Sequence, residues 1–570
     1  MLENLKKVLK EQLLNLKEDK KYFICLFYSQ FFPLLFFVIN NYKVYHKSGL
    51  KYLIMAIRAS FATTALFLVV YFMFRSIFKK KYKIILGALV LINFFFYSLE
   101  FAVYINFGTQ ITPELLYILF ETNKNETLEF LKSYSNWKLV ILLIYWIGGL
   151  LYFNLKRVKD LIILSIALLG ITFGMIKVSN LEGSFYLKNT HIIKSIGRSL
   201  HRYRSEMKDI ETFYKNFDEK FEKMKVETDK KEAVYVMVIG ESLSKYHSEV
   251  YGYPREDQPF LTGEKNKDNL IVFNDVVSPH HFTRETLKKL VTTQAHDSKV
   301  KFAEAENIID IMKKAGFKTY WLSNQEDFAY RGAGLSSVSQ RADVTKFTES
   351  SFSDTKEKLL DGALLPLIDD AFKDNAPKKF IIIHLFGSHL GYNQRYPKEF
   401  TKFDLNEQPV YFTDLQKKNH EVLNHYDNSV YYNDYMLKNI IEKLKADSRE
   451  SYLLYLSDHG QSLGDKVEFF GNQDPRKDVR GVEVPFMVWV SDKYKENNPN
   501  IVQAIKKSVN RPYITEDTIY TLIDLSSIRY SEQEEKKSVI NSNFTIKKRT
   551  VSSEGDVYEE QKKQQEKNYN

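Results

Sequence analysis

Cysteine is almost absent from this sequence: its 570 residues include only Cys25, which lies in an apolar segment. The polar part of the chain therefore has no disulfide bonds and no thiolate chemistry. A basic strip interleaved with aromatic residues is also absent, and many lysines flank apolar segments, where membrane topology explains them. The net charge of +10 therefore does not indicate nucleic-acid binding, and we expect no nucleic-acid partner.

The first apolar segment lacks the small-residue pattern of a cleavage site, and four more apolar segments follow it, so we do not interpret it as a cleaved signal. A membrane-spanning helix needs about 20 apolar residues. Five segments meet this requirement, near 22–40, 52–76, 83–106, 137–155 and 160–177. The sequence therefore predicts a five-helix transmembrane domain over residues 1–178.

Basic residues determine the predicted orientation, because lysine and arginine concentrate in cytoplasmic loops. They cluster in three places: before the first span, between the second and third, and between the fourth and fifth (Lys6, Lys7, Lys10, Lys17, Lys20, Lys21; Lys79, Lys80, Lys81, Lys83; Lys156, Arg157, Lys159). Lys43, Lys47 and Lys51 oppose this orientation. The majority predicts a cytoplasmic N-terminus, with the loop 107–136 and the C-terminal domain outside.

Two ionisable residues lie within predicted spans, Arg58 in the second and Glu100 in the third. Each is compatible with a snorkelling or paired structural residue, or with binding of a polar lipid headgroup near the interface.

The remainder reads as an α/β protein. Residues 179–232 are charged with helical spacing, which predicts a bridging helix and linker. From 233 to 527, short apolar runs alternate with helical patterns, which predicts a largely parallel sheet buried on both faces. The expected strands are 233–240, 317–323, 378–387, 451–458 and 484–492; the expected helices are near 304–315, 354–373 and 424–446. Residues 528–570 have little apolar content, which predicts a partly disordered polar tail.

Acidic and imidazole side chains directly follow two predicted strands. Glu241 ends the run VMVIGE, and the pair Asp458-His459 ends YLLYLSDH. Glu241 alone suits either a metal ligand or a cap on the amides of the next helix. Parallel strands deliver such residues to one edge of the sheet. Together, these carboxylates and the imidazole suit zinc in tetrahedral coordination.

A transfer or hydrolytic site also needs a nucleophile, and HHFTRETLKK offers Thr283 at a predicted loop-to-helix junction. Helix N-terminal amides there could stabilise a phosphate, and a metal could lower the pKa of the hydroxyl. The same pattern suits an N-cap, with Glu285 in the first turn. The two roles are compatible.

Two further candidates are His384 and His389, in HLFGSHLGYNQRYP. A single histidine at a strand end is most simply a core residue. The second, which follows five residues later beyond Gly387, favours phosphate binding.

With these residues in place, the chain resembles the membrane-anchored phosphoethanolamine transferases of the sulfatase and alkaline-phosphatase-like superfamily. The resemblance covers nearly the whole length: the spans, ILFETNKNE, GES followed by YGYPRE, NDVVSPHHFT, KFIIIHLFGSH with RYP, YDNSVYYNDY and YLSDHG. It is closest to the subgroup acting on lipopolysaccharide core heptose. In the lipid A subgroup, cysteines flank the threonine that matches Thr283, and this sequence has none there.

The resemblance implies an inner-membrane enzyme with a periplasmic catalytic domain. It implies one tightly bound zinc held by Glu241, Thr283, Asp458 and His459. Thr283 is also the implied nucleophile, which takes phosphoethanolamine from phosphatidylethanolamine and passes it to a lipopolysaccharide acceptor. His384 and His389 match family histidines near the phosphate, of which His389 is the better candidate for contact.

This sequence departs from the family at one point: no histidine follows His459, although the family has one about a dozen residues later. The departure leaves the proton donor unassigned and weakens the case for a second metal. Two alternatives stay open: a phosphoglycerol transferase of the same superfamily that acts on a cell-envelope glycan, and a noncatalytic membrane scaffold.

Overall fold

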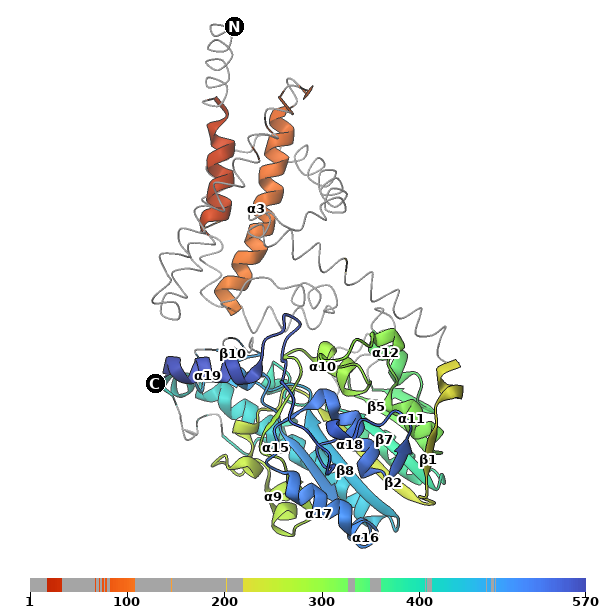
Figure 1. The fold of residues 1–570 in the computed structure, drawn as a ribbon. Helices are drawn as coiled ribbons and strands as arrows, with labels where there is room; N and C mark the ends of the chain where they lie inside the picture. Colours follow the sequence, from red (N-terminus) through yellow and green to blue (C-terminus); the bar gives the residue numbers. More distant parts are fainter. Residues whose placement is uncertain are drawn as a thin grey trace. The chain divides into compact units, whose positions relative to one another are not determined.

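The computed structural model divides the chain into two compact units, Met1–Arg204 and Ser205–Asn570 (Figure 1). In the second unit it describes residues 219–325, 334–348, 360–404, 406, 413–467, 469–472, 476 and 478–569. In the first it describes 18–32, 82–107, Phe67, Tyr71, Phe74, Arg75, Ile77, Phe78, Tyr145 and His201.

The first unit contains the helix α3 (Tyr82–Phe107) and a helical stretch at residues 18–32. Asp19 is buried and accepts hydrogen bonds from Tyr71 at 3.0 Å and Tyr82 at 2.6 Å. No helix in the described part of the chain is both long and apolar enough to cross a membrane. The predicted span 160–177, most of the spans 52–76 and 137–155, residues 33–40 of the first span, the loop residues 108–136 and Arg58 lie outside the described residues.

A seven-stranded sheet forms the centre of the second unit, in the order β3-β11-β8-β2-β7-β5-β6. The bounds are β2 Ala233–Gly240, β3 Leu270–Val272, β5 Lys318–Ser323, β6 Val344–Phe347, β7 Lys378–His384, β8 Glu450–Ser457 and β11 Phe486–Val490. Strands β8, β2, β7, β5 and β6 are parallel, as expected. The sheet is mixed rather than wholly parallel, because β11 pairs antiparallel with both β8 and β3.

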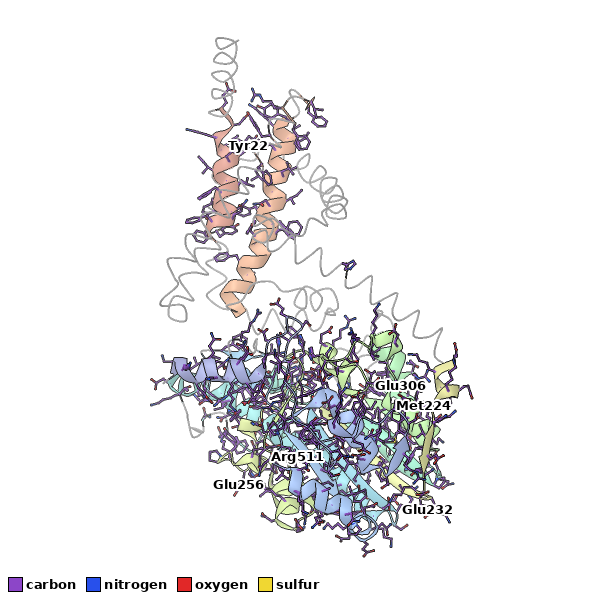
Figure 2. All side chains as sticks on the ribbon, viewed as in Figure 1. Tyr22, Met224, Glu232, Glu256, Glu306 and Arg511 are labelled. Atoms are coloured by element: carbon purple, nitrogen blue, oxygen red, sulfur yellow. The ribbon has the colours of Figure 1, made fainter. Side chains whose placement is uncertain are left out.

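Alternate residues of β2 pack into two separate cores, because successive side chains of a strand point to opposite faces. Tyr235 and Met237 belong to one core, and Val236 and Val238 to the other. Every residue of β2 and β8 is buried, which explains their continuous apolar sequence. Met224, labelled in Figure 2, extends the first core.

Helices cover both faces of the sheet. One face packs against α9 (Pro259–Asn266), α13 (Leu365–Lys373) and α15 (His420–Ala446). The other packs against α10 (Thr283–Leu290), α11 (Ile308–Lys314), α12 (Gly334–Ser339), α16 (Asp492–Asn497), α17 (Pro499–Ser508) and α18 (Thr518–Leu525). The expected helix near 354–373 is shorter in the described residues, since α13 begins at Leu365 after a 3-10 turn.

Short elements complete the unit: β1 (Val226–Thr228), β4 (Val276–Val277), β9 (Ser462–Leu463), β10 (Phe470–Gly471), β12 (Tyr513–Ile514), β13 (Ile528–Tyr530), α14 (Asp414–Lys418) and α19 (Tyr558–Tyr569). Part of the region expected to be a bridging linker is ordered, since β1 pairs antiparallel with β13. Most of residues 179–218 lie outside the described part.

The expectation of a partly disordered tail from 528 was wrong for the described residues. This region contributes β13 and α19, and it buries a few apolar side chains, singly or in adjacent pairs (Val539, Ile540, Val551, Val557, Tyr558). Because long polar stretches separate these groups, the average composition does not reveal them.

Candidate active site

Two parallel strands place three candidate metal ligands side by side. Gly240, the last residue of β2, is in register with Ser457, the last residue of β8. Glu241 and Asp458 therefore leave the same edge of the sheet, at the carboxyl ends of the strands, where ligands bind in such folds. Both side chains are buried, and so is His459.

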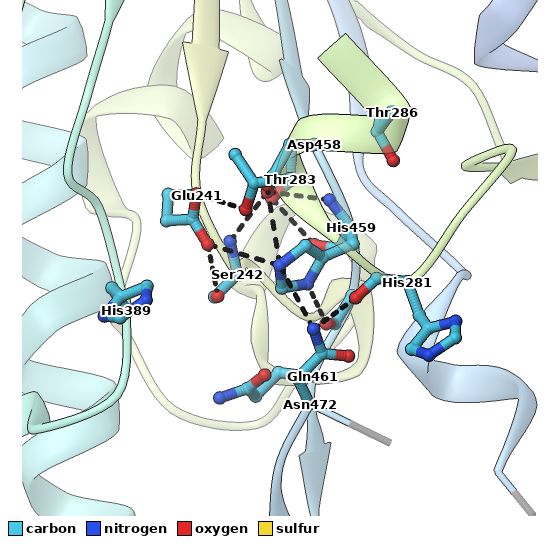
Figure 3. A network of polar contacts seen from close by, with 12 residues as sticks. Glu241, Ser242, His281, Thr283, Thr286, His389, Asp458, His459, Gln461 and Asn472 are labelled. Carbon is cyan, nitrogen blue, oxygen red and sulfur yellow. Dashed lines mark hydrogen bonds and ion pairs between the residues drawn. The ribbon is translucent and has the colours of Figure 1, made fainter. Parts of the chain in front are cut away.

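We call Glu241, Asp458 and His459 the metal triad; one donor atom from each lies within 4.8 Å of the others (Figure 3). His459 Nε2 is 3.2 Å from Glu241 Oε1 and 3.5 Å from Asp458 Oδ2. In a tetrahedral zinc site with bonds of about 2.0–2.1 Å, the ligand atoms are about 3.3 Å apart. The spacing and the donor set therefore fit zinc.

Backbone groups orient the donor atoms of the triad. Asp458 Oδ1 accepts from the amides of Ser242 at 3.0 Å and His459 at 2.7 Å, whereas Oδ2 makes no hydrogen bond among the described residues. His459 Nδ1 is 2.8 Å from the carbonyl of Gly460. A proton on Nδ1 leaves the Nε2 lone pair available to a metal. Ser242 has a left-handed backbone (φ 59°), a strained conformation typical of functional sites.

Thr283 is the first residue of α10, and its Oγ1 donates to Glu241 Oε2 at 3.1 Å. The N-cap interpretation is wrong, because Phe282 occupies the N-cap and no side chain caps the helix. Capping by Glu241 is wrong as well, because Ser244 caps the following 3-10 turn, Lys245–His247. The hydroxyl therefore lies beside the triad, at the N-terminal end of α10.

The two carboxyls of the triad titrate differently. Burial and the neighbouring Glu241 carboxylate raise the pKa of Asp458. Burial also acts to raise the pKa of Glu241, but the hydrogen bond and charge of His459 leave it well below its ordinary value. Burial opposes protonation of His459, yet Asp458 and Glu241 raise its pKa to about 9. Without a metal, the triad therefore holds a proton on the imidazole, and a cation must displace it.

His384 and His389 occupy different environments. His384 ends β7 and is buried; burial lowers its pKa to about 4, so the ring is neutral. Its Nδ1 is 3.4 Å from Ser323 Oγ, and its Nε2 has no hydrogen-bond partner among the described residues. In Figure 3, His389 lies on the side of Glu241 away from His459. Its charge is among those that lower the pKa of Glu241.

Two amide side chains at the site have no signal in the sequence. Gln325 Nε2 donates to Glu241 Oε2 at 3.1 Å and to the Leu385 carbonyl at 3.1 Å. Asn472 Nδ2 donates to the carbonyl of His281 and lies 3.5 Å from His459 Nε2. Isolated glutamine or asparagine in a loop is too common to indicate a site.

The model of the family described as Sulfatase matches residues 233–528. The chain belongs to the sulfatase family. A phosphoethanolamine transferase named EptC from Escherichia coli is 28% identical over 516 residues, which cover 86% of this chain and 87% of that protein. The phosphoethanolamine transferase CptA from Salmonella typhimurium is 26% identical over 77% of this chain and 79% of its own length.

Solved structures agree with these relatives. The periplasmic domain of Escherichia coli EptC in complex with zinc is 30% identical and matches with a TM-score of 0.54, over 59% of this chain and 95% of that one. The integral membrane protein EptA from Neisseria meningitidis, at 20% identity, shares the fold over 91% of this chain and 97% of its own, with a TM-score of 0.64. The predicted resemblance to phosphoethanolamine transferases, and with it the prediction of an enzyme of the transferase class, is confirmed.

Proposed function

We propose that the chain transfers phosphoethanolamine from phosphatidylethanolamine to a lipopolysaccharide acceptor, with core heptose favoured over lipid A. The observation that carries this proposal is the hydrogen bond of Thr283 Oγ1 to Glu241 within the triad, at the N-terminus of α10. A hydroxyl beside a cation site and helix amides suits phosphoryl transfer. The names of the relatives supply the transferred group.

One zinc, held by Glu241, Asp458, His459 and Thr283, would act as a Lewis acid and lower the pKa of the threonine hydroxyl. Two atoms support this assignment. Asp458 Oδ2 is buried and makes no hydrogen bond among the described residues, and His459 Nε2 faces the carboxylate oxygens of Glu241 and Asp458. The zinc complex of the EptC domain agrees with it.

The chain's own groups account for both halves of the reaction. Thr283 Oγ forms a bond to the donor phosphorus while the bond from phosphorus to the diacylglycerol oxygen breaks, which leaves phosphoethanolamine on Thr283. Glu241 Oε2 lies at 3.1 Å to accept the hydroxyl proton, and this proton then passes to the departing diacylglycerol oxygen. In the second half, an acceptor hydroxyl attacks the same phosphorus while the bond from phosphorus to Thr283 Oγ breaks, and the acceptor proton passes through Glu241 to the released Thr283 oxygen.

The N-terminal end of α10, which carries Thr283, would stabilise developing negative charge on the phosphoryl oxygens through the helix dipole. Gln325 donates a hydrogen bond to Oε2 of Glu241, and the other carboxylate oxygen, Oε1, faces His459. We assign His389 to contact the phosphoryl group or its acceptor, and neutral His384 to support the site from the end of β7.

The membrane arrangement is part of the proposal: five spans in the bacterial inner membrane, a cytoplasmic N-terminus and a periplasmic catalytic domain. The lysine distribution supports the orientation. The shared fold with an integral membrane transferase over 91% of the chain supports the anchor. Phosphatidylethanolamine cannot leave the bilayer cheaply, so an anchored enzyme meets its donor in place.

Structural analysis of lipopolysaccharide from a deletion strain tests the proposal. We expect loss of phosphoethanolamine from one core residue, restored by the wild-type chain and by Thr283→Ser but not by Thr283→Ala. Loss of glycerol phosphate from a glycan instead would favour the phosphoglycerol transferase. Full complementation by Thr283→Ala would favour the scaffold.

A further inference from the structure

The C-terminal segment, residues 549–569, contacts a buried carboxylate, that of Glu483. Glu483 is buried, and its Oε1 accepts a hydrogen bond from Tyr558 and forms an ion pair with Lys562 at 3.2 Å. Lys562 also donates to the Tyr558 hydroxyl at 2.9 Å. Both partners come from α19, so the last helix of the chain neutralises a charge in the interior.

The same carboxylate contacts the loops that carry the triad. Glu483 Oε2 accepts from the Tyr246 hydroxyl at 2.5 Å, five residues beyond Glu241. A Cβ on Gly460, the neighbour of His459, would lie 2.7 Å from the Glu483 carbonyl and 2.0 Å from that of Arg480. The backbone at 480–483 therefore forms the wall against which the Asp458-His459 turn rests.

α19 also fixes the start of this wall. The amide of Val479 donates to Gln565 Oε1 at 2.9 Å, and Gln565 is buried. Val479 and Val482 share a small apolar cluster with Val551, Tyr558 and Val277 of β4. Both ends of residues 479–483 are thus held by the C-terminal segment.

The segment reaches the approach to the nucleophile as well. Arg549 is buried and donates to Asp275 Oδ1 at 2.6 Å, just before β4. Ser553 Oγ lies 3.2 Å from His280 Nε2, three residues before Thr283. The amide of Ser278 donates to the carbonyl of Val482 at 2.7 Å, which links this approach to the wall.

We propose that the C-terminal segment is a positioning element of the active site: through Glu483 and residues 479–482, it sets the His459 turn and the Thr283 loop at the separation that one metal ion requires. The proposal relies on the metal site of the proposed function but not on its substrates. It assigns positioning roles to Tyr558, Lys562 and Gln565, none of which touches the triad.

Electrostatics support this arrangement. Burial acts to raise the pKa of Glu483, but Lys245 and Lys562 together hold it below its ordinary value. A buried carboxylate that loses one cationic partner must move toward water or take up a proton. Either response would shift the backbone on which Gly460 rests.

The test uses the full-length chain and matched lysines of α19. Lys562→Met combined with Tyr558→Phe removes both α19 partners of Glu483, whereas Lys563→Met changes an exposed lysine of the same helix. Zinc affinity is measured by competition with a chromophoric chelator, and the geometry of the site by the absorption spectrum of the cobalt-substituted chain. We expect about tenfold weaker zinc binding and an altered cobalt spectrum for the double variant only.

If the double variant does not fold, two single variants with smaller changes test the proposal. Gln565→Ala removes the acceptor of the Val479 amide, and Gln564→Ala changes its exposed neighbour. We expect weaker zinc binding for Gln565→Ala alone. Wild-type zinc affinity and cobalt spectra in the folded variants would overturn the proposal, even if their melting temperatures fall. These readouts need no substrate, so they stand apart from the failure of any transfer assay.

Discussion

Residues 233–241 and residues 549–569 both shape the active site, but they do so by opposite means. The first is a fully buried apolar strand that delivers Glu241 at its end. The second is a mostly polar segment that buries a few residues and contacts the site through Glu483. We infer from this comparison that the candidate metal ligands come from the ends of sheet strands, whereas their spacing depends on distant polar contacts.

The largest expected effect lies beside the metal triad, at the start of α10. Thr283→Ala removes the proposed nucleophile, and transfer to lipopolysaccharide should fall by at least about a thousandfold. Thr283→Ser keeps a hydroxyl and should retain measurable turnover. Initial rates of transfer by the purified chain measure both. Equal rates for Thr283→Ala and the wild type would remove Thr283 from the chemistry.

Substitution of a triad residue should weaken zinc binding more than any substitution in the C-terminal segment does. Glu241→Gln keeps the shape of the side chain but removes its charge, and zinc affinity should fall by more than about a hundredfold. The exposed Glu442→Gln is the control. Metal analysis and chelator competition report the outcome, with about one zinc expected per wild-type chain. Full zinc content in Glu241→Gln would contradict the ligand assignment.

Zinc affinity should fall with decreasing pH, because the cation competes with a proton for His459, whose pKa Asp458 and Glu241 raise to about 9 against the effect of burial. Below this value, affinity should decrease by about tenfold per pH unit, and more steeply once Asp458 is protonated. The stability of the zinc-free chain should instead rise as pH decreases. Since the pKa of His459 is raised in the fold, its contribution to stability is complete below about 6.5 and is lost as pH rises toward 9.

Chelator competition between pH 6 and 9, with thermal melting of zinc-free protein in parallel, separates the two trends. Zinc affinity independent of pH in this window would show that the imidazole does not exchange its proton for the metal.

The smallest effect tests whether the polar segment is part of the fold. Val551 is fully buried, so Val551→Ala should lower the free energy of unfolding by about 2 kcal/mol. Val422, which is 37% exposed, should tolerate the same change within about 0.5 kcal/mol. Denaturant unfolding compares them. Equal stability of the two variants would mean that residues 549–569 are not docked in solution.

Much of the fold could be read from the sequence where a pattern had a direct physical cause. Runs such as AVYVMVIG indicate strands buried on both faces, and parallel strand ends bring Glu241 together with Asp458. The direction of β11 could not be read from its apolar run, since such a run is the same in either direction. The described residues between β8 and β11 form two short strands and a 3-10 turn but no α-helix, whereas a parallel crossover usually contains one.

The remaining differences arise where single contacts override composition. The helical start at Thr283 looks like a cap, but Phe282 holds the cap position and leaves the hydroxyl to Glu241. Gln325 and Asn472 reach the site from loops, without any periodic signal. The C-terminal segment folds because Tyr558 and Val551 meet an apolar cluster far away in the sequence.

Peptide mass spectrometry of the full-length chain, quenched during turnover with phosphatidylethanolamine and zinc, tests the account's central claim most directly. We predict a phosphoethanolamine adduct on Thr283 that accumulates without acceptor and disappears when lipopolysaccharide is added. Transfer at the wild-type rate with no adduct on Thr283, or with the adduct on another residue, would contradict the account.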